Sequence, residues 1–398
     1  MKALFFLVAL DVFCVFMPLP IFSTYIKSLG GSPFTQGMVN SCAAFVSLLN
    51  NPIVGSLSDT KGRRAILVRC LLVGGLANLI LASAPSILIM FVGKIMAAFA
   101  SPVNILLRAT VTDVMKSDQE TKLFFQKLLP LTGLVMLLSA GISGYISELK
   151  YGFTVIFLCV SIAYAISAGT VLAQLPNDLI IKPNNKKTSD IPYLRKSITE
   201  LQNAIMNLKN IDWENYGDIF ATKAASEVSL AWLTTNIGLF LLNEFGIQGR
   251  RTGYFFMISS VFIILSGILK MKLKDRLAKM NDHYIIMTCS LIMTVAFLGT
   301  SLAPSVYVIG LCMIAISMSK SFVDVTFTEA ITTRANEKDR GKIISAFETL
   351  PLIAQFIAPF FSGIFSLAFR QRLLLGLTTI PASVGVFISY KQIKTKND

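Results

Sequence analysis

The chain has 398 residues, of which 54% are hydrophobic and only 15% are charged, and its mean hydropathy is +0.66. Soluble domains carry about 25% charged residues, so this composition excludes a soluble enzyme, a nucleic-acid-binding module and a disordered chain. The formal net charge of +14 indicates loops that face an anionic cytoplasmic membrane surface, because apolar stretches flank the basic clusters.

Apolar stretches of about 20 residues recur along the chain, and each is long enough to cross the hydrocarbon core of a bilayer as a helix. They predict an all-α integral membrane protein with twelve transmembrane helices. The predicted spans are 3–26, 36–57, 65–84, 86–112, 125–147, 152–173, 216–244, 251–271, 284–303, 305–331, 342–369 and 371–390.

Residues 174–215 form the longest predicted connection between spans, and they are rich in Lys, Asn and other polar residues. This predicted cytoplasmic linker divides the chain into an N-terminal six-helix bundle at 1–173 and a C-terminal six-helix bundle with a short basic tail at 216–398. Basic residues concentrate in the connections on the same side as this linker. The positive-inside rule therefore predicts that both termini are cytoplasmic.

The two halves carry acidic residues at matching places. Asp11 and Glu227 lie in the first span of each half. Two further pairs are separated by the same number of residues: Asp59 with Asp275, and Asp113 with Glu329. We interpret this spacing as a duplicated six-helix unit, with two like halves arranged about an axis along the membrane normal.

The residues that commonly hold metals or perform catalysis are sparse. The six cysteines all lie in or beside apolar stretches and form no CxxC pair, and the one histidine, His283, lies in a predicted loop. We interpret the cysteines as small core residues, and a histidine-based metal centre is not expected. The sequence therefore predicts neither an enzyme nor a bound cofactor or metal.

The connection between the second and third spans contains the most specific motif, Gly55-Ser-Leu-Ser-Asp59-Thr-Lys-Gly62-Arg63-Arg64. Gly62 permits a tight turn, and Asp59 can accept hydrogen bonds at a helix N-terminus. Arg63 and Arg64 can form paired hydrogen bonds with carboxylates. These residue types suit a hinge at the cytoplasmic side.

This motif resembles the signature G-x-L-x-D-x-x-G-R-[RK] of the major facilitator superfamily at every defining position. The resemblance implies two pseudo-symmetric six-helix bundles and a secondary active transporter that moves a small organic solute by alternating access. It also implies a conformational lock made by six residues: Gly55, Asp59, Gly62, Arg63, Arg64 and Asp113. In this lock Arg63 pairs with Asp113, and Asp59 lies near residues 341–345.

Four shorter segments resemble the organic-cation-transporter-like solute carriers and their tetracycline-efflux-like relatives. They are Leu10-Asp11, Leu29-Gly30-Gly31-Ser32-Pro33, Thr222-Lys223-Ala-Ala-Ser226 and Asp324-Val-Thr. This resemblance implies an antiporter for proton-coupled efflux of lipophilic organic cations. Lys94 stands where proton-coupled members carry Arg, and it keeps the charge but loses the planar fork.

Ionisable side chains at membrane depth usually face a cavity or a partner. The candidates for proton coupling or substrate binding are Asp11, Lys94, Lys223, Glu227, Trp232, Lys320 and Asp324. The charged residues of the C-terminal half can pair in two ways. Lys223 with Glu227 and Lys320 with Asp324 can each pair on their own helix at a spacing of four residues. Alternatively, Glu227 reaches Lys320 on another helix, and breaking that pair drives a conformational change.

Of the remaining three candidates, Asp11 and Trp232 also have two interpretations each. Asp11 is either satisfied by Asn40 or Gln36, or it carries a proton, because burial favours the neutral carboxyl. Lys94 lies closer to the outer side than Asp11, so direct contact between them is not expected. Trp232 either packs against neighbouring helices or stacks on a flat or cationic substrate.

The expected partners are the lipid bilayer, a small organic solute and protons, with the chain acting as a monomer and without nucleic acid. Two alternative functions stay open. One is a proton symporter or uniporter of organic anions or metabolites. The other is a non-transporting receptor or scaffold with a transporter fold, for which the 174–215 linker would be the docking segment.

Overall fold

The computed structural model describes residues 2–115, 118–175, 212–277, 280–334 and 340–397, and these residues form α-helices without strands. The helices in the first part of the chain are α1 (Lys2–Phe16), α2 (Phe22–Ser28), α3 (Pro33–Lys61), α4 (Arg63–Ala82), α5 (Ile87–Phe99), α6 (Val103–Val114), α7 (Asp118–Ile146) and α8 (Gly152–Gln174). The later helices are α10 (Trp213–Phe245), α11 (Arg250–Leu277), α12 (Asp282–Leu302), α13 (Val306–Arg334), α14 (Arg340–Phe365), α15 (Gln371–Gly376) and α16 (Thr379–Asn397).

Each of the twelve predicted spans coincides with one helix or with two consecutive helices, which confirms the all-α membrane fold. All twelve spans were predicted as single helices, but three of them are broken in the structure, at 17–21, 100–102 and 377–378. Pro18, Pro20 and Pro102 lie in the first two breaks. Proline lacks a backbone N–H and clashes with the preceding turn of a helix, which explains these two interruptions.

Nine helices or helix pairs among the described residues are long and apolar enough to cross a membrane. The predicted spans that fall short are 3–26, 36–57 and 125–147. The first is divided into α1 and α2, and the third contains only the shorter apolar helix Pro130–Ile146. The predicted count of twelve single spanning helices is therefore not reproduced as such.

The described chain separates into two compact units. Unit 1 contains residues 2–30, 42–175 and 249–254, and unit 2 contains 31–41, 212–248 and 255–397, apart from the gaps given above. The predicted bundle boundaries at 173 and 216 stay a prediction. Most of the predicted linker, residues 176–211, lies outside the described residues.

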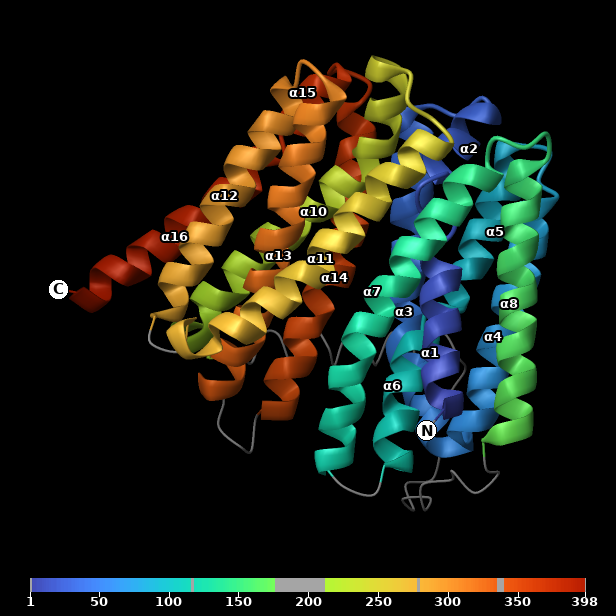
Figure 1. The fold of residues 1–398 in the computed structure, drawn as a ribbon, viewed down its shortest axis with the longest axis horizontal. Coiled ribbons are helices and arrows are strands. Elements are labelled where there is room, and N and C mark those ends of the chain that lie inside the picture. Colours follow the sequence, from blue (N-terminus) through green and yellow to red (C-terminus); the bar gives the residue numbers. More distant parts are fainter. Residues whose placement is uncertain (1, 116–117, 176–211, 278–279, 335–339, 398) are drawn as a thin grey trace. The chain divides into compact units, whose positions relative to one another are not determined.

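Small residues bring the helices of unit 1 close together. Figure 1 shows α4 beside α8, and their contact is centred on Gly74 and Gly75. The Ser161 hydroxyl donates to the carbonyl of Gly75 over 2.9 Å, and a Cβ on Gly74 would lie 3.0 Å from the Tyr164 ring. Such close backbone approach is the usual way in which helices associate in lipid.

A polar contact ties the end of α7 to the start of α11 within unit 1. The backbone N–H of Arg250 donates to Glu148 Oε1 over 3.0 Å, and its guanidinium donates to Glu148 Oε2 over 2.8 Å. The backbone hydrogen bond is the first of several favourable effects that lower the pKa of the Glu148 carboxyl. This exposed pair therefore stays ionised at neutral pH.

Unit 2 has an apolar core along α10, α12, α13 and α14. One cluster includes Phe240, Phe297 and Ile309, and a second includes Phe220 and Phe327. Large apolar side chains such as those of Leu302, Leu311 and Val295 are exposed on the outside of the helices. An apolar exterior around an apolar core is expected where lipid, and not water, surrounds the helices.

Candidate functional site

Four charged side chains in unit 2 form a closed ring between α10 and α13. Lys223 Nζ lies 2.8 Å from Glu227 Oε1 and 2.9 Å from Asp324 Oδ1. Lys320 Nζ lies 2.6 Å from the same Glu227 oxygen and 2.5 Å from the same Asp324 oxygen. Positive and negative groups alternate around the ring, and its net charge is zero.

The ring combines the two arrangements that the sequence left open. Lys223 with Glu227 and Lys320 with Asp324 are pairs within one helix, because side chains four residues apart share a helix face. Glu227 with Lys320 and Lys223 with Asp324 are pairs across the two helices. Both kinds of ion pair are present at once, so each charge has two partners.

The ring is largely shielded from solvent by its own helices and by aromatic residues. The side chains of Lys223, Glu227 and Lys320 are 8%, 10% and 12% exposed, whereas that of Asp324 is 39% exposed. Lys223 Nζ also lies 5.7 Å from the Phe327 ring and 5.4 Å from the Phe347 ring. Asp324 is therefore the member of the ring that a solute or water reaches most easily.

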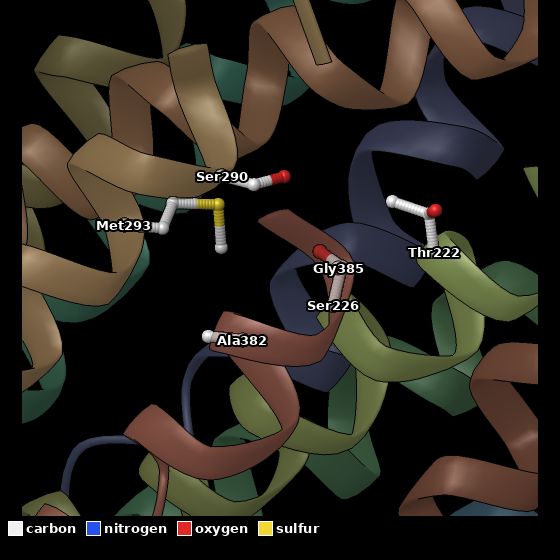
Figure 2. Close-up of a pocket in the computed structure, with 6 residues that line it drawn as sticks. All are labelled: Thr222, Ser226, Ser290, Met293, Ala382 and Gly385. Atoms are coloured by element: carbon white, nitrogen blue, oxygen red, sulfur yellow. The ribbon is translucent and has the colours of Figure 1, made fainter. Parts of the chain in front are cut away.

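A small open pocket with a cavity volume of about 10 Å³ lies next to this part of α10. Figure 2 shows the six residues that line it, from α10, α12 and α16: Thr222, Ser226, Ser290, Met293, Ala382 and Gly385. Ligand pockets usually measure about 300–1,000 Å³, so this pocket is too small for most organic solutes. Its lining residues were not predicted from the sequence as a site.

In unit 1, Asp11 is buried in α1 and has a neutral partner. Asn104 in α6 donates to Asp11 Oδ2 over 3.1 Å, and Arg108 follows one turn later on the same helix. The suggested partner Gln36 instead donates through Nε2 to the carbonyl of Thr235 in unit 2. Asn104 was not among the predicted partners of Asp11, although an amide in a predicted span was a visible signal.

Lys94 in α5 is the second isolated charge of unit 1. Its Nζ lies 4.2 Å above the ring of Phe22 in α2, and it takes part in none of the ion pairs of the described residues. A cation over an aromatic face is stabilised by the ring quadrupole, but it remains a net charge. Asp11 and Lys94 therefore have different partners.

Trp232 in α10 lies in an apolar cluster with Ala354, Ala358 and Leu374. Its indole N–H donates to the carbonyl of Leu374 over 2.8 Å. The residue is buried and is not among those that line the pocket of Figure 2. This geometry matches the packing interpretation of Trp232.

The motif between α3 and α4 forms a compact polar cluster in unit 1. Gly62 is the single residue between the two helices, and its φ of 92° lies in a region that side chains rarely allow. Arg63 contacts the carboxylate of Asp113 at the end of α6, and it lies 3.3 Å from Asp59. Arg64 Nη2 donates to the carbonyl of Leu172 over 2.5 Å.

The corresponding acid of the second half, Glu329, also has a basic partner. Lys270 Nζ lies 3.4 Å from Glu329 Oε2. The side chain of Asp275 lies outside the described residues, as do those of most residues from 341 to 345, which were expected near Asp59. The contact of Arg63 with Asp113 and that of Lys270 with Glu329 are thus similar acid–base pairs in unit 1 and unit 2.

These observations define a helical membrane protein with several spans, in which charged side chains lie along the membrane-spanning helices. Residues 4–359 match the family described as the Major Facilitator Superfamily, and the chain belongs to this superfamily of membrane transport proteins. No curated protein sequence matches the chain.

Several solved structures share the fold at low sequence identity. The human organic anion transporter MFSD10 (TETRAN) is 14% identical with a TM-score of 0.68, and the alignment covers 98% of each chain. The nucleoside transporter NupG is 13% identical with a TM-score of 0.77, covering 99% of this chain and 98% of that one. A POT family transporter in complex with a thioalcohol-conjugated peptide is 13% identical with a TM-score of 0.79, covering 100% and 96%.

The first prediction concerns Gly62. We expect Gly62→Ala to destabilise the protein by about 1–3 kcal/mol, because a side chain is strained at this φ. Gly55→Ala is the matched control, since Gly55 lies inside α3 and a Cβ there meets nothing within 4 Å. Thermal unfolding of the purified proteins measures both, and equal stability of the two variants would contradict the prediction.

The second prediction concerns the neutral ring. Glu227→Gln leaves two lysines facing one carboxylate, and an uncompensated buried charge costs about 3–5 kcal/mol. The double variant Glu227→Gln with Lys320→Met is neutral again, so we expect it to unfold at a higher temperature than Glu227→Gln alone. Losses that simply add in the double variant would show that the four charges are independent.

Proposed function

We propose that the chain is a secondary active transporter that moves a small organic solute by alternating access, coupled to protons through Asp11. The observation that carries this proposal is the buried Asp11 carboxylate, which is held by one amide hydrogen bond from Asn104. An isolated carboxylate at membrane depth is costly, and taking up a proton removes its charge.

Glu227 is the weaker candidate for the coupling residue. Its Oε1 atom is close to the amino groups of both Lys223 and Lys320. Glu227 therefore already has two cationic partners, and the ring to which it belongs has a net charge of zero. We therefore assign proton coupling to Asp11. To the ring we assign a structural role, which is to link α10 and α13.

The proposed substrate is a lipophilic organic cation that leaves in exchange for protons. A carboxylate that binds either a proton or a cation, and not both, couples the two movements directly. The family resemblance of the Leu10-Asp11 and Asp324-Val-Thr segments supports this class of substrate. The partly exposed Asp324 carboxylate is a second negative group that such a cation could approach.

The cluster of Asp59, Arg63 and Asp113 is proposed as part of the cytoplasmic lock. The proposal rests on the direct contacts of Arg63 with both carboxylates and on the single-residue link at Gly62. We further propose that both termini face the cytoplasm and that the transporter works as a monomer. The basic connections on one side support this orientation.

The third prediction tests proton coupling in reconstituted vesicles with an imposed pH gradient. We expect Asp11→Asn to abolish gradient-driven accumulation of an organic-cation probe, because the amide at position 11 binds neither a proton nor the cation. Any exchange of the probe that remains should not depend on the gradient. Glu227→Gln should keep the dependence on the gradient. Glu244→Gln is the control, since Glu244 pairs with Arg372 at an exposed position.

Unchanged pH dependence in Asp11→Asn would overturn proton coupling through Asp11, and unchanged pH dependence in both Asp11→Asn and Glu227→Gln would exclude both acids as the coupling residue. If the wild-type protein moves neither cationic nor anionic probes but still shows ligand-dependent thermal shifts, the receptor alternative replaces transport. These outcomes separate failure of the coupling mechanism from failure of the transporter assignment.

A second candidate function is transport of an organic anion, and Lys94 favours it. The amino group of Lys94 contacts the Phe22 ring and has no acidic partner among the described ion pairs. An unneutralised cation at membrane depth attracts a carboxylate or phosphate group.

The fourth prediction separates the two substrate classes. If the substrate is an anion bound by Lys94, we expect Lys94→Gln to raise the KM for an organic-anion probe about tenfold, which corresponds to losing one charged interaction. Lys94→Arg should keep most of the affinity. Unaltered anion transport by Lys94→Gln would exclude this second candidate.

A further inference from the structure

The chain's one histidine lies in a second cluster of charges in unit 2. His283, in the first turn of α12, is 4% exposed. Its Nε2 atom lies 2.6 Å from Arg334 Nη2 in the last turn of α13 and 3.5 Å from Asp218 Oδ2 in α10. Arg334 Nη1 donates to both oxygens of Asp218 over 3.1 Å. The cluster therefore joins three helices at one place.

Further hydrogen bonds hold Arg334 in this position. The Tyr216 hydroxyl donates to the carbonyl of Arg334 over 3.0 Å. Arg334 Nη1 also donates to the carbonyl of Asn215 over 3.2 Å. Arg334 therefore contacts the start of α10 through its backbone as well as its guanidinium.

The geometry determines which form of His283 fits. An arginine guanidinium has only N–H donors and stays protonated, so the short contact requires His283 Nε2 to accept. Only a neutral imidazole with its proton on Nδ1 can do so. A protonated imidazole would place a second cation 2.6 Å from Arg334 and would compete with it for Asp218.

Other charged groups nearby are already paired or lie further along the helices. Asp282 is in the same turn of α12, and Lys270 of α11 pairs with Glu329 of α13. Glu214 lies in the exposed first turn of α10. The positive end of the α12 macrodipole also disfavours a charge on His283. Asp218, whose Oδ2 lies 3.5 Å from His283 Nε2, favours the protonated form, and this carboxylate is already engaged by Arg334.

We propose that His283 is a proton-sensitive latch that joins the starts of α10 and α12 to the end of α13. The neutral form accepts the hydrogen bond from Arg334 and keeps the three helices together, whereas the protonated form breaks this bond. The same α10 and α13 carry the ring of Lys223, Glu227, Lys320 and Asp324. Acidification at the helix ends where His283 contacts Arg334 therefore loosens the two helices that hold the ring. This effect does not depend on which solute the protein moves.

The fifth prediction is tested by thermal unfolding of the purified protein between pH 5 and 8. In His283→Gln the amide oxygen can still accept from Arg334, but it does not titrate. We expect the unfolding temperature of the wild-type protein to fall relative to that of His283→Gln by about 2–4 °C as the pH drops through about 6.5, where an ordinary histidine takes up a proton. All other titrating groups are common to the two proteins, so their difference isolates His283.

Tyr284→Phe is the control, because Tyr284 is the exposed neighbour of His283; it should follow the wild-type profile. If His283→Gln does not fold, Asp218→Asn gives a second measurement, since removing the acid should make the loss of stability on acidification steeper. A difference between wild type and His283→Gln that does not change with pH would overturn the proposal. So would a relative gain of wild-type stability at low pH, or an unchanged slope in Asp218→Asn.

Discussion

The cost of placing charges at membrane depth is the constraint on which the interior of this protein depends. A charge removed from water needs a partner at short distance, because the desolvation penalty of each ion is several kcal/mol. In unit 2 the ring of Lys223, Glu227, Lys320 and Asp324 meets this constraint with two partners for every charge. The contacts across helices specify one register of α10 against α13, because a shift of one residue would separate them. The ring therefore positions two helices that apolar side chains alone could pack in several ways.

Unit 1 meets the same constraint differently. Asp11 occupies the position that matches Glu227 in the duplicated pattern, yet its partner is the amide of Asn104 and not a lysine. Lys94 is stabilised by the Phe22 ring. Neither partner neutralises the charge, so each of these residues can still bind a proton or a charged solute. The two units are thus chemically different, with isolated charges in unit 1 and a self-neutralised ring in unit 2.

Periodicity and spacing predicted the parts of the structure that depend on neighbouring residues. Apolar stretches located all twelve segments, and the prolines at 18 and 20 gave a signal for the break between α1 and α2. The spacing of four residues predicted the pairs of Lys223 with Glu227 and of Lys320 with Asp324. Contacts between segments that are distant in the sequence could not be predicted in this way. Asn104 and Asp11 are far apart in sequence, and only the packing of α6 on α1 brings them together. His283 was placed in a loop because its polar neighbours hide the start of α12.

The environments of the acids imply that they respond differently to protons. Glu227 lies in contact with two lysines in a ring whose net charge is zero. Protonating Asp11 removes a charge that has no cationic partner within ion-pair distance among the described residues, while Asn104 can turn its amide oxygen towards the new donor. His283 lies between a cation and an anion that already satisfy each other. A proton at Asp11 therefore relieves an unfavourable charge, whereas a proton at His283 disturbs a completed network. Glu227 already has two cationic partners. This difference is why we assign proton coupling to Asp11 and assign structural roles to the two networks of unit 2.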